Sequence, residues 1–477
     1  MKPERPDAAD DGVNLRCATA VAEAVQSRQV RAAYVLEVLA DRIHSMNPVL
    51  NALVATRLDG ARVEAARTDS RLHAGLPVPP LAGVVFTVKD VLATADLPTT
   101  CGSRVMTGHR TALDAMVVRR LRAAGAILVA KTNCPEFAFG IDTTNDLHGR
   151  TLNPLGDITP GGSSGGEAAA LASGMSCLGV GTDFGGSVRW PAQCTALVGL
   201  RPTVGLVPGT GTLPALADDE PVAPNARSLQ GRVQVTGLLG HCVADVATGL
   251  RVVAGPDGVD PLGLPAVLAG ARVVDLSRLE VRHGHTLAGQ QVDRAVADAV
   301  SWAVEALSRG GAATAEGLPS QLATAVGLYS RLRRLETLDE IVRVSVGRTS
   351  ELTSMVRSLL SSVPSHPPQV VAGLWALRDR LAGELAQWLT GDRLLVLPVA
   401  ARLPPRSDEV EPLQIDQLEL LAMCRAVSLF GLPAISVPCP RSPDGRPVSV
   451  QVVGPPFRED LVLTVATYLE QCATAAT

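Results

Sequence analysis

The chain has 477 residues, 46% of them hydrophobic and 19% charged, which is enough apolar material for the core of a large enzyme. The formal net charge of -4 provides no basic surface, so we expect neither nucleic acid nor an anionic membrane as a partner. Nine cysteines without a Cys-x-x-Cys motif and eight scattered histidines indicate free thiols in a reducing cytoplasm and no zinc site.

Helices are expected at the N-terminal end of the chain. Residues 1–12 are polar and are interpreted as a flexible tail, without the apolar core of a signal peptide. No apolar run reaches the roughly 18 residues that span a bilayer, so we expect a cytoplasmic protein. Apolar residues at helical spacing predict two antiparallel helices in 18–44, ending before Asn47 and Pro48, and a polar helix follows in 58–74.

Short apolar strands then alternate with helices. The buried strand GVVFTVKDV covers 83–91, a helix is predicted for 114–125, and AILVAKTN at 126–133 is another strand. A helix of small residues at 167–173 precedes a strand at 178–181. This alternation is typical of an α/β protein in which helices cover the faces of a sheet.

The segment 263–388 has a different character. It opens with the strand-like ARVVDL at 271–276, continues with an amphipathic helix at 293–311 and stays rich in helix. We interpret it as a variable cover that shapes the substrate entrance, within a single domain that spans 13–477. Three returning strands and a closing helix are expected after it, in RLLVLPV, LPAISVPCP, VSVQVVGPP and EDLVLTVATYLEQ.

The loop TPGGSSGGEA at 159–168 allows several interpretations. A phosphate-binding loop would need a lysine where Glu167 stands, so phosphate binding is disfavoured. Gly161, Ser163 and Gly165 match the spacing of a hydrolase nucleophile elbow, but a loop with two prolines precedes them in place of the required strand. A flexible linker is disfavoured because the glycines run directly into an alanine-rich helix.

A second glycine loop and one lysine add chemistry. Gly185 and Gly186 precede Ser187, and such glycines let backbone N–H groups converge on one point, as an oxyanion hole requires. Only three of the 43 basic residues are lysines, and a lysine can lose its proton and act as a base where an arginine cannot. One of them, Lys89, lies near the end of a predicted strand, and alternation places Asp90 on the opposite face, where it need not hold Lys89 charged.

These segments belong to a set of motifs that extends over nearly the whole chain. The set comprises GVVFTVKD, AKTNCPEFAFG, GRTLNP, PGGSSGGEAAALASG, GTDFGGSVRWPA, VGLRPT, FGLPAISVPCP and PVSVQVVGPPFRED. Their order, and the 24-residue step from Ser163 to Ser187, resemble the amidase signature family. The resemblance implies an α/β fold in which a large twisted mixed sheet is covered by helices on both faces, as an α/β/α sandwich.

The resemblance also implies a Ser-cisSer-Lys triad. Ser187 would be the nucleophile, Ser163 a bridging residue that follows a cis peptide bond and relays the proton, and Lys89 the base. Such a base needs its pKa lowered from about 10.4 toward neutrality, which burial of the lysine would supply. The oxyanion hole would be formed by the backbone N–H groups of Phe184, Gly185, Gly186 and Ser187.

Further residues receive supporting roles from the same resemblance. Ser164 would hold the loop by a local hydrogen bond, and Asp183 and Arg189 would brace the nucleophile loop rather than touch substrate. Ala138 and Asp142 are expected to line the substrate pocket, although the Asp142 side chain could equally cap a turn. No metal and no cofactor are expected.

The implied function is that of a cofactor-free amidohydrolase, which cleaves the carboxamide C–N bond of a small-molecule substrate through a serine acyl-enzyme. A homodimer is common in the family. One rival function is that of the glutaminase subunit of a tRNA-dependent amidotransferase, although Phe184 and Trp190 bracket the nucleophile where that subunit usually has smaller or polar groups. Two further rivals are a non-catalytic protein on the same fold and a Ser-His-Asp hydrolase with Ser163 as nucleophile.

Overall fold

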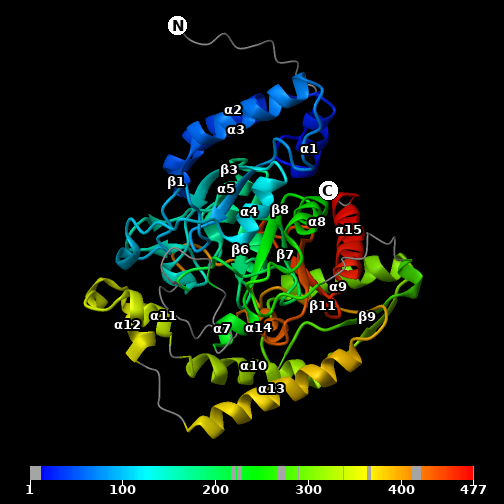
Figure 1. Cartoon of the computed structure of the whole chain (residues 1–477). Coiled ribbons are helices and arrows are strands. Elements are labelled where there is room, and N and C mark those ends of the chain that lie inside the picture. Colours follow the sequence, from blue (N-terminus) through cyan, green and yellow to red (C-terminus); the bar gives the residue numbers. More distant parts are fainter. Residues whose placement is uncertain are drawn as a thin grey trace.

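One mixed sheet organises the fold (Figure 1). The computed structural model describes residues 12–215, 222, 228–265, 275–287, 289–336, 338–361, 367–410 and 420–475. The strands of the sheet within these residues are β1 (Leu53–Thr56), β2 (Val85–Lys89), β3 (Ile127–Thr132), β6 (Leu178–Asp183), β7 (Val198–Arg201), β8 (Val235–Gly240), β9 (Glu280–His283), β10 (Ala313–Glu316), β11 (Arg393–Pro398), β12 (Ala434–Pro438) and β13 (Ser449–Val453). Their order across the sheet is β1-β3-β2-β6-β8-β7-β12-β13-β11-β9-β10. The short strands β4 (Thr144–Asn145) and β5 (Gly149–Arg150) form a separate ribbon.

The strand directions bring together the segments that follow β2 and β6. β2 lies between β3 and β6 and runs parallel to both, so the carboxyl ends of the three strands lie at one edge of the sheet. β8 pairs antiparallel with β6, and the following pairs as far as β11 are antiparallel too. The predicted mixed sheet is therefore confirmed.

Helices cover both faces of this sheet. The helices are α1 (Ala18–Gln26), α2 (Ala32–Leu50), α3 (Leu58–His73), α4 (Met116–Ala123), α5 (Gly165–Ala172), α6 (Arg189–Cys194), α7 (Leu229–Val233), α8 (Val243–Val253), α9 (Arg294–Arg309), α10 (Ser320–Arg334), α11 (Asp339–Val344), α12 (Ser354–Ser361), α13 (Pro368–Trp388), α14 (Ala422–Leu429) and α15 (Glu459–Ala475). Gly179 on β6 packs against Leu171 of α5, whereas its neighbour Leu178 packs against Gly249 of α8. Successive strand residues point to opposite faces, so α5 and α8 lie on opposite sides of the sheet.

The prediction that the N-terminal helices end before Asn47 and Pro48 is wrong. α2 continues through Pro48 to Leu50. Pro48 removes one backbone donor, and the last turn is closed by the Asn51 N–H, which donates to the Asn47 carbonyl oxygen at 2.8 Å. Asn47 Oδ1 accepts from the Leu53 N–H at 2.7 Å, which ties the end of α2 to the start of β1.

The segment 263–388 is rich in helix, as expected, and it also extends the sheet. Its described residues include α9 to α13, and α10 and α13 lie together along the lower side of the view in Figure 1. β9 and β10 were not predicted, because each has only four residues and no continuous apolar run. The strand expected at 271–276 lies outside the described residues for 271–274, and Leu276 begins a short 3-10 helix. None of the helices in the described part of the chain is long and apolar enough to cross a membrane.

Candidate active site

Three segments at the carboxyl edge of β2 and β6 carry the predicted triad. Lys89 ends β2, Ser163 lies in the loop before α5, and Ser187 lies in the turn between β6 and α6. Because β2 and β6 run parallel, the residues that follow them meet at the same edge. The peptide bond between Gly162 and Ser163 is cis, which is the isomer that the family resemblance implies.

Lys89 is fully buried and its ammonium group contacts hydroxyl groups. Its Nζ donates to Ser163 Oγ at 2.6 Å and to Thr182 Oγ1 at 3.1 Å. Asp90 lies 3.4 Å from Lys131 instead, and no carboxylate in the described segments forms an ion pair with Lys89. Burial therefore lowers the pKa of Lys89 to about 8.

Glu167 is a second buried titratable group beside the site, and no sequence signal assigned it a role there. Its carboxyl group accepts hydrogen bonds from Thr87 Oγ1 and, at 2.8 Å, from Thr132 Oγ1. Thr132 is the register partner of Lys89 on β3, and Thr87 precedes Lys89 by two residues on β2. Burial raises the pKa of Glu167 to about 8, so the carboxyl group is mostly protonated at neutral pH.

The loop that carries Ser163 is packed too closely for side chains at two glycines. A Cβ on Gly162 would lie 2.7 Å from the carbonyl oxygen of Gly140, a backbone atom. A Cβ on Gly181 of β6 would lie 2.7 Å from Ser164 Oγ. That Ser164 hydroxyl donates to the carbonyl oxygen of Thr182 at 3.5 Å, so it contacts the end of β6 as well as the loop.

Ser187 differs from Ser163 in exposure and in its neighbours. Ser163 is 1% exposed, whereas Ser187 is half-buried and its hydroxyl makes no hydrogen bond within the described ranges. The four predicted oxyanion donors are not equally available to a substrate, because the Gly186 N–H already donates to Asp183 Oδ1 at 2.8 Å. The predicted donors whose N–H groups have no acceptor among the described residues are Phe184, Gly185 and Ser187.

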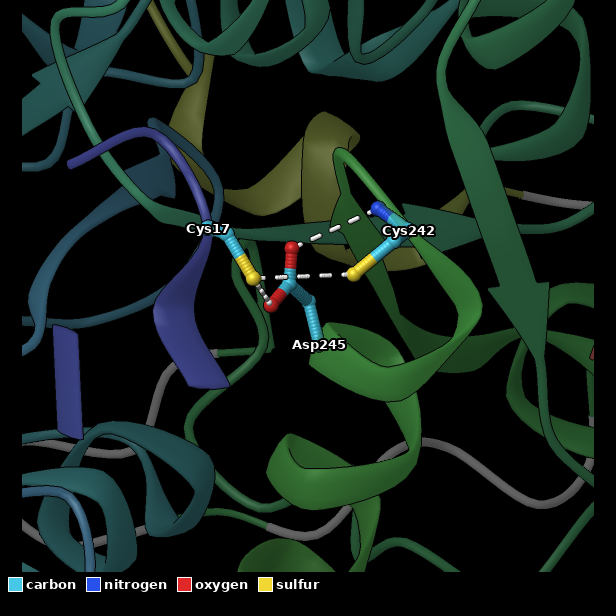
Figure 2. Close-up of side chains that lie close together, drawn as sticks. All are labelled: Cys17, Cys242 and Asp245. Atoms are coloured by element: carbon cyan, nitrogen blue, oxygen red, sulfur yellow. Dashed lines mark hydrogen bonds between the residues drawn. The ribbon is translucent and has the colours of Figure 1, made fainter. Parts of the chain in front are cut away.

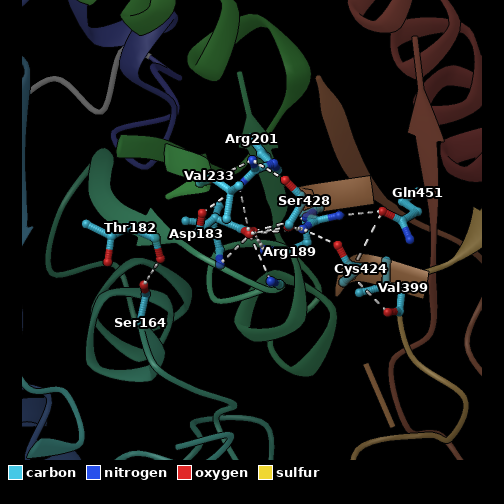
Figure 3. A network of polar contacts seen from close by, with 12 residues as sticks. Ser164, Thr182, Asp183, Arg189, Arg201, Val233, Val399, Cys424, Ser428 and Gln451 are labelled. Atoms are coloured by element: carbon cyan, nitrogen blue, oxygen red, sulfur yellow. Dashed lines mark hydrogen bonds and ion pairs between the residues drawn. The ribbon is translucent and has the colours of Figure 1, made fainter. Parts of the chain in front are cut away.

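A buried carboxylate at the end of β6 holds the nucleophile loop (Figure 3). Asp183 accepts from the Gly186 N–H and, at 3.2 Å, from the Val188 N–H. Arg189 donates to both carboxylate oxygens of Asp183, at 3.0 and 2.9 Å. Burial opposes ionisation of Asp183, but the charges of Arg189 and Arg201 outweigh it and hold the pKa of Asp183 below its usual range.

Arg189 connects this loop to the C-terminal part of the chain. Its guanidinium group donates to Gln451 Oε1 on β13 at 2.7 Å and to Ser428 Oγ on α14 at 2.8 Å. Arg201 on β7 donates to the Asp183 carbonyl oxygen at 2.5 Å. Asp183 and Arg189 are both fully buried, so in this arrangement they contact the protein rather than a ligand.

The segment expected to line the substrate pocket lies against the Ser163 loop. Asp142 accepts from Thr159 Oγ1 at 2.5 Å and pairs with Arg150 at 3.2 Å, so its carboxylate is engaged within the protein. Ala138 is half-buried and has a left-handed backbone with φ of 62°. The contacts of Asp142 match the interpretation in which its side chain orders a loop.

Two side chains of α10 lie over the nucleophile loop. The ring centroids of Phe184 and Tyr329 are 5.4 Å apart, and the Arg333 guanidinium carbon lies 5.7 Å from the Phe184 ring centre. A Cβ on Gly185 would lie 2.8 Å from Tyr329 Oη. The helix-rich segment therefore contacts the loop directly, and sequence reasoning missed these residues because no local motif connects them to it.

A cavity of about 60 Å³ lies beside the same edge of the sheet. Its wall includes Phe137, Leu213, Thr236 and Ile341. Thr236 on β8 is the register partner of Thr182, whose hydroxyl accepts from Lys89. The cavity is therefore next to the strand ends that carry the predicted triad.

Comparisons with known proteins identify the family. Residues 34–463 match the family model described as Amidase. The A-type subunit of glutamyl-tRNA(Gln) amidotransferase from Acidothermus cellulolyticus is 31% identical over 95% of this chain and 94% of its own length, and that from Nocardia farcinica is 33% identical over 96% and 98%. Among solved structures, 6-aminohexanoate cyclic dimer hydrolase complexed with substrate superposes with a TM-score of 0.84 at 29% identity, over 97% of this chain and 98% of that chain. The chain therefore belongs to the amidase signature family.

Proposed function

We propose that the protein is an amidohydrolase that cleaves a carboxamide C–N bond through an acyl-enzyme on Ser187, with Lys89 as base and Ser163 as proton relay. The observation that carries this proposal is the 2.6 Å hydrogen bond between Lys89 Nζ and Ser163 Oγ in a buried site. A lysine that is buried without an ion-pair partner loses its proton more readily, so it can act as a base near neutral pH.

The proposed reaction begins with neutral Lys89. Its amine takes the proton of Ser163, Ser163 takes the proton of Ser187, and the Ser187 oxygen attacks the amide carbonyl carbon. The C–N bond of the tetrahedral intermediate then breaks, and the leaving nitrogen receives the proton that returns through Ser163. Water attacks the resulting ester by the same proton route, which releases the carboxylic acid and restores Ser187.

Backbone N–H groups of the nucleophile loop stabilise the oxyanion in this proposal. The N–H groups of Phe184, Gly185 and Ser187 are the ones that remain available to a substrate oxygen. The Gly186 N–H fixes the loop through Asp183, so it contributes to the oxyanion only by sharing its hydrogen between the two acceptors.

A second candidate function is glutamine hydrolysis within a tRNA-dependent amidotransferase, in which the released ammonia passes to protein partners. The names of the two curated relatives favour it, since both are the A-type subunit of glutamyl-tRNA(Gln) amidotransferase. The sequence argument against this function is that Phe184 and Trp190 bracket Ser187, where that subunit usually has smaller or polar groups. Trp190 is buried and its Nε1 donates to the Ile141 carbonyl oxygen at 2.8 Å, so it packs behind the loop, whereas Phe184 is half-buried.

Covalent labelling tests the assignment of the nucleophile. A fluorophosphonate probe should add one adduct to the wild-type protein and none to Ser187→Ala, measured by intact-protein mass spectrometry. Ser350→Ala, at an exposed serine, is the matched control and should label like the wild type. An adduct that survives Ser187→Ala would point to Ser163 instead, and an unlabelled wild type would favour a non-catalytic protein.

Turnover by the chain alone separates the two candidate functions. The purified chain is assayed for amine or ammonia release from a panel of carboxamides that includes glutamine. Hydrolysis of other carboxamides supports the amidohydrolase, whereas ammonia release from glutamine only, dependent on added amidotransferase proteins, favours the amidotransferase role.

Substitution of each of the eight histidines should preserve turnover, and loss of turnover at one position would favour a Ser-His-Asp mechanism.

Four broader expectations accompany this proposal. A small-molecule amide as substrate, a cytoplasmic location and a homodimer all stay predictions, as does the single domain over 13–477. Size-exclusion chromatography with light scattering measures the oligomeric state directly.

A further inference from the structure

Two helix N-termini meet at a cluster that has no part in the proposed reaction. Cys17 precedes α1 and Cys242 precedes α8, so each cysteine caps the N-terminal end of a helix. The side chains of both cysteines point toward Asp245, which lies in the first turn of α8 (Figure 2). Both cysteines are half-buried, whereas Asp245 is fully buried.

The separation of the two sulfur atoms in this cluster suits a tetrahedral metal ion. The two Sγ atoms are 3.7 Å apart, and Cys17 Sγ lies 3.1 Å from Asp245 Oδ1. Two thiolates on one tetrahedral Zn²⁺ at the usual bond length of about 2.3 Å are about 3.8 Å apart, whereas a disulfide needs about 2.05 Å. The sulfur atoms can therefore bind Zn²⁺ almost where they are, but must approach each other to form a disulfide.

The two helix N-termini offset part of the repulsion between the Asp245 carboxylate and the thiolate ligands. The N-terminal end of a helix carries a partial positive charge, which stabilises a thiolate placed there. Two thiolates and the Asp245 carboxylate carry three negative charges, and a divalent cation leaves the cluster with one. The zinc-bound cluster is net negative, so its electrostatic interaction with the two positive helix ends is favourable.

Neighbouring donors fix the orientation of the carboxylate. Asp245 Oδ1 accepts from the Thr19 N–H at 3.0 Å and from Thr19 Oγ1 at 3.3 Å. Asp245 Oδ2 accepts from the N–H groups of His241 and Cys242, at 3.2 and 3.3 Å. Hydrogen bonds of this kind orient metal ligands and raise metal affinity in known metal sites.

We propose that Cys17, Cys242 and Asp245 form a binding site for a thiophilic divalent cation, Zn²⁺, with water as the fourth ligand. Binding releases the two thiol protons and all but one of the ion's water ligands to solvent, and forms two Zn–S bonds and one Zn–O bond to Asp245, while the remaining water is the fourth ligand. The ion fastens the N-terminal segment to α8. The sequence predicted no zinc site because the two cysteines are 225 positions apart and share no local motif.

Zinc binding by the reduced, chelator-treated full-length protein tests this proposal. Wild-type protein should bind one Zn²⁺ per chain in competition with a chromophoric chelator, and Co²⁺ should give the absorption bands of a tetrahedral thiolate complex. Cys17→Ser and Cys242→Ser should each weaken zinc binding by more than about 100-fold, which exceeds the 10–100-fold cost of losing an outer hydrogen bond. Thr19→Val keeps the backbone donor but loses the hydroxyl group, so it should weaken binding by about tenfold.

Cys472→Ser is the matched control, because Cys472 is another half-buried thiol outside the cluster, and it should bind zinc like the wild type. Circular dichroism of the metal-free variants verifies that they fold. Stoichiometric binding that persists in both Cys17→Ser and Cys242→Ser would overturn the proposal. So would failure of the folded wild type to bind Zn²⁺ at micromolar concentration, or formation of a Cys17–Cys242 disulfide in the presence of equimolar zinc.

Discussion

Two neighbouring lysines are buried in this protein, and their partners separate their roles. Lys131 lies 3.4 Å from Asp90 and donates to Thr99 Oγ1 at 2.7 Å, so its positive charge has a direct counterion. Among the described residues, Lys89 has hydroxyl partners only. An ion pair recovers part of the cost of burying a charge, so Lys131 is suited to holding structure and Lys89 to giving up a proton.

The pH dependence of turnover should report the charge of Lys89. The pKa of Lys89 is lowered to about 8, so the neutral base increases about tenfold for each pH unit below that value and levels off above it. We expect kcat/KM to rise in the same way from pH 6 to about 8 and then to reach a plateau. Steady-state kinetics in buffers of constant ionic strength measure this, and a maximum in acid would contradict Lys89 as the base.

Glu167→Gln is the matched variant for this profile. Because burial keeps Glu167 mostly protonated below about pH 8, replacing its carboxyl group with the neutral amide should leave the rising limb in place. The amide retains an oxygen that accepts from Thr132, which keeps the local packing. A rising limb that moves toward acid would mean that Glu167 is ionised in the protein and stabilises the charged form of Lys89.

The residues of the site that could be predicted are those encoded in local motifs. Lys89, Ser163 and Ser187 each lie in a glycine-rich or strand-end pattern that can be identified from the sequence. Thr182 and Glu167 lie inside the same motifs, but their roles depend on which strand pairs with which. Pairing of β2 with β6 is a property of the folded chain, and no periodicity encodes it.

At the scale of elements, the contact between α5 and β6 positions the Ser163 loop. Gly179 and Gly181 alternate along β6 and leave room for α5 and for Ser164. Side chains at these two positions would overlap with Glu167 and Leu171 of α5 and with Ser164. Since Ser163 lies just before α5, the distance between α5 and the sheet also sets the distance between Ser163 and Lys89.

Gly179→Ala should therefore destabilise the protein and reduce turnover. The new Cβ would lie 2.7 Å from both Glu167 Oε1 and Leu171 Cδ1, so these buried side chains or α5 itself must shift, at a cost of about 1–3 kcal/mol in the free energy of unfolding. Gly373→Ala is the control, because Gly373 is exposed on α13 with no atom within 4 Å of a new Cβ. Helix propensity should make that variant up to about 1 kcal/mol more stable in denaturant titrations, and equal loss in both variants would refute the argument.

The buried central elements were predictable, and the short peripheral ones were not. β2 and β3 are buried along their whole length and appear in the sequence as continuous apolar runs. β9 and β10 have four residues each and half-exposed side chains, so their pattern does not differ from that of a loop. Their place in the sheet depends on β11, with which β9 pairs in parallel.

At the scale of the whole molecule, the proposed zinc site and the proposed reaction are independent. The chemistry of Lys89, Ser163 and Ser187 needs no metal, and the cysteine cluster belongs to α1 and α8. A strong chelator should therefore leave kcat unchanged at 25 °C while it lowers Tm by a few degrees, because only the native state holds the ion. Parallel activity and thermal-unfolding measurements test this, and loss of turnover on chelation that zinc restores would contradict a metal-free reaction.

The partners of Arg189 have a consequence for the synthesis of the protein. A ribosome releases the chain in order, so Ser187 emerges well before Ser428 and Gln451, which are the residues that hold Arg189 against the nucleophile loop. Until those residues arrive, the buried charges of Asp183 and Arg189 lack part of their hydrogen bonding. Until Ser428 and Gln451 have been synthesised, a nascent chain thus lacks part of the contacts that hold the loop of Ser187, the proposed nucleophile.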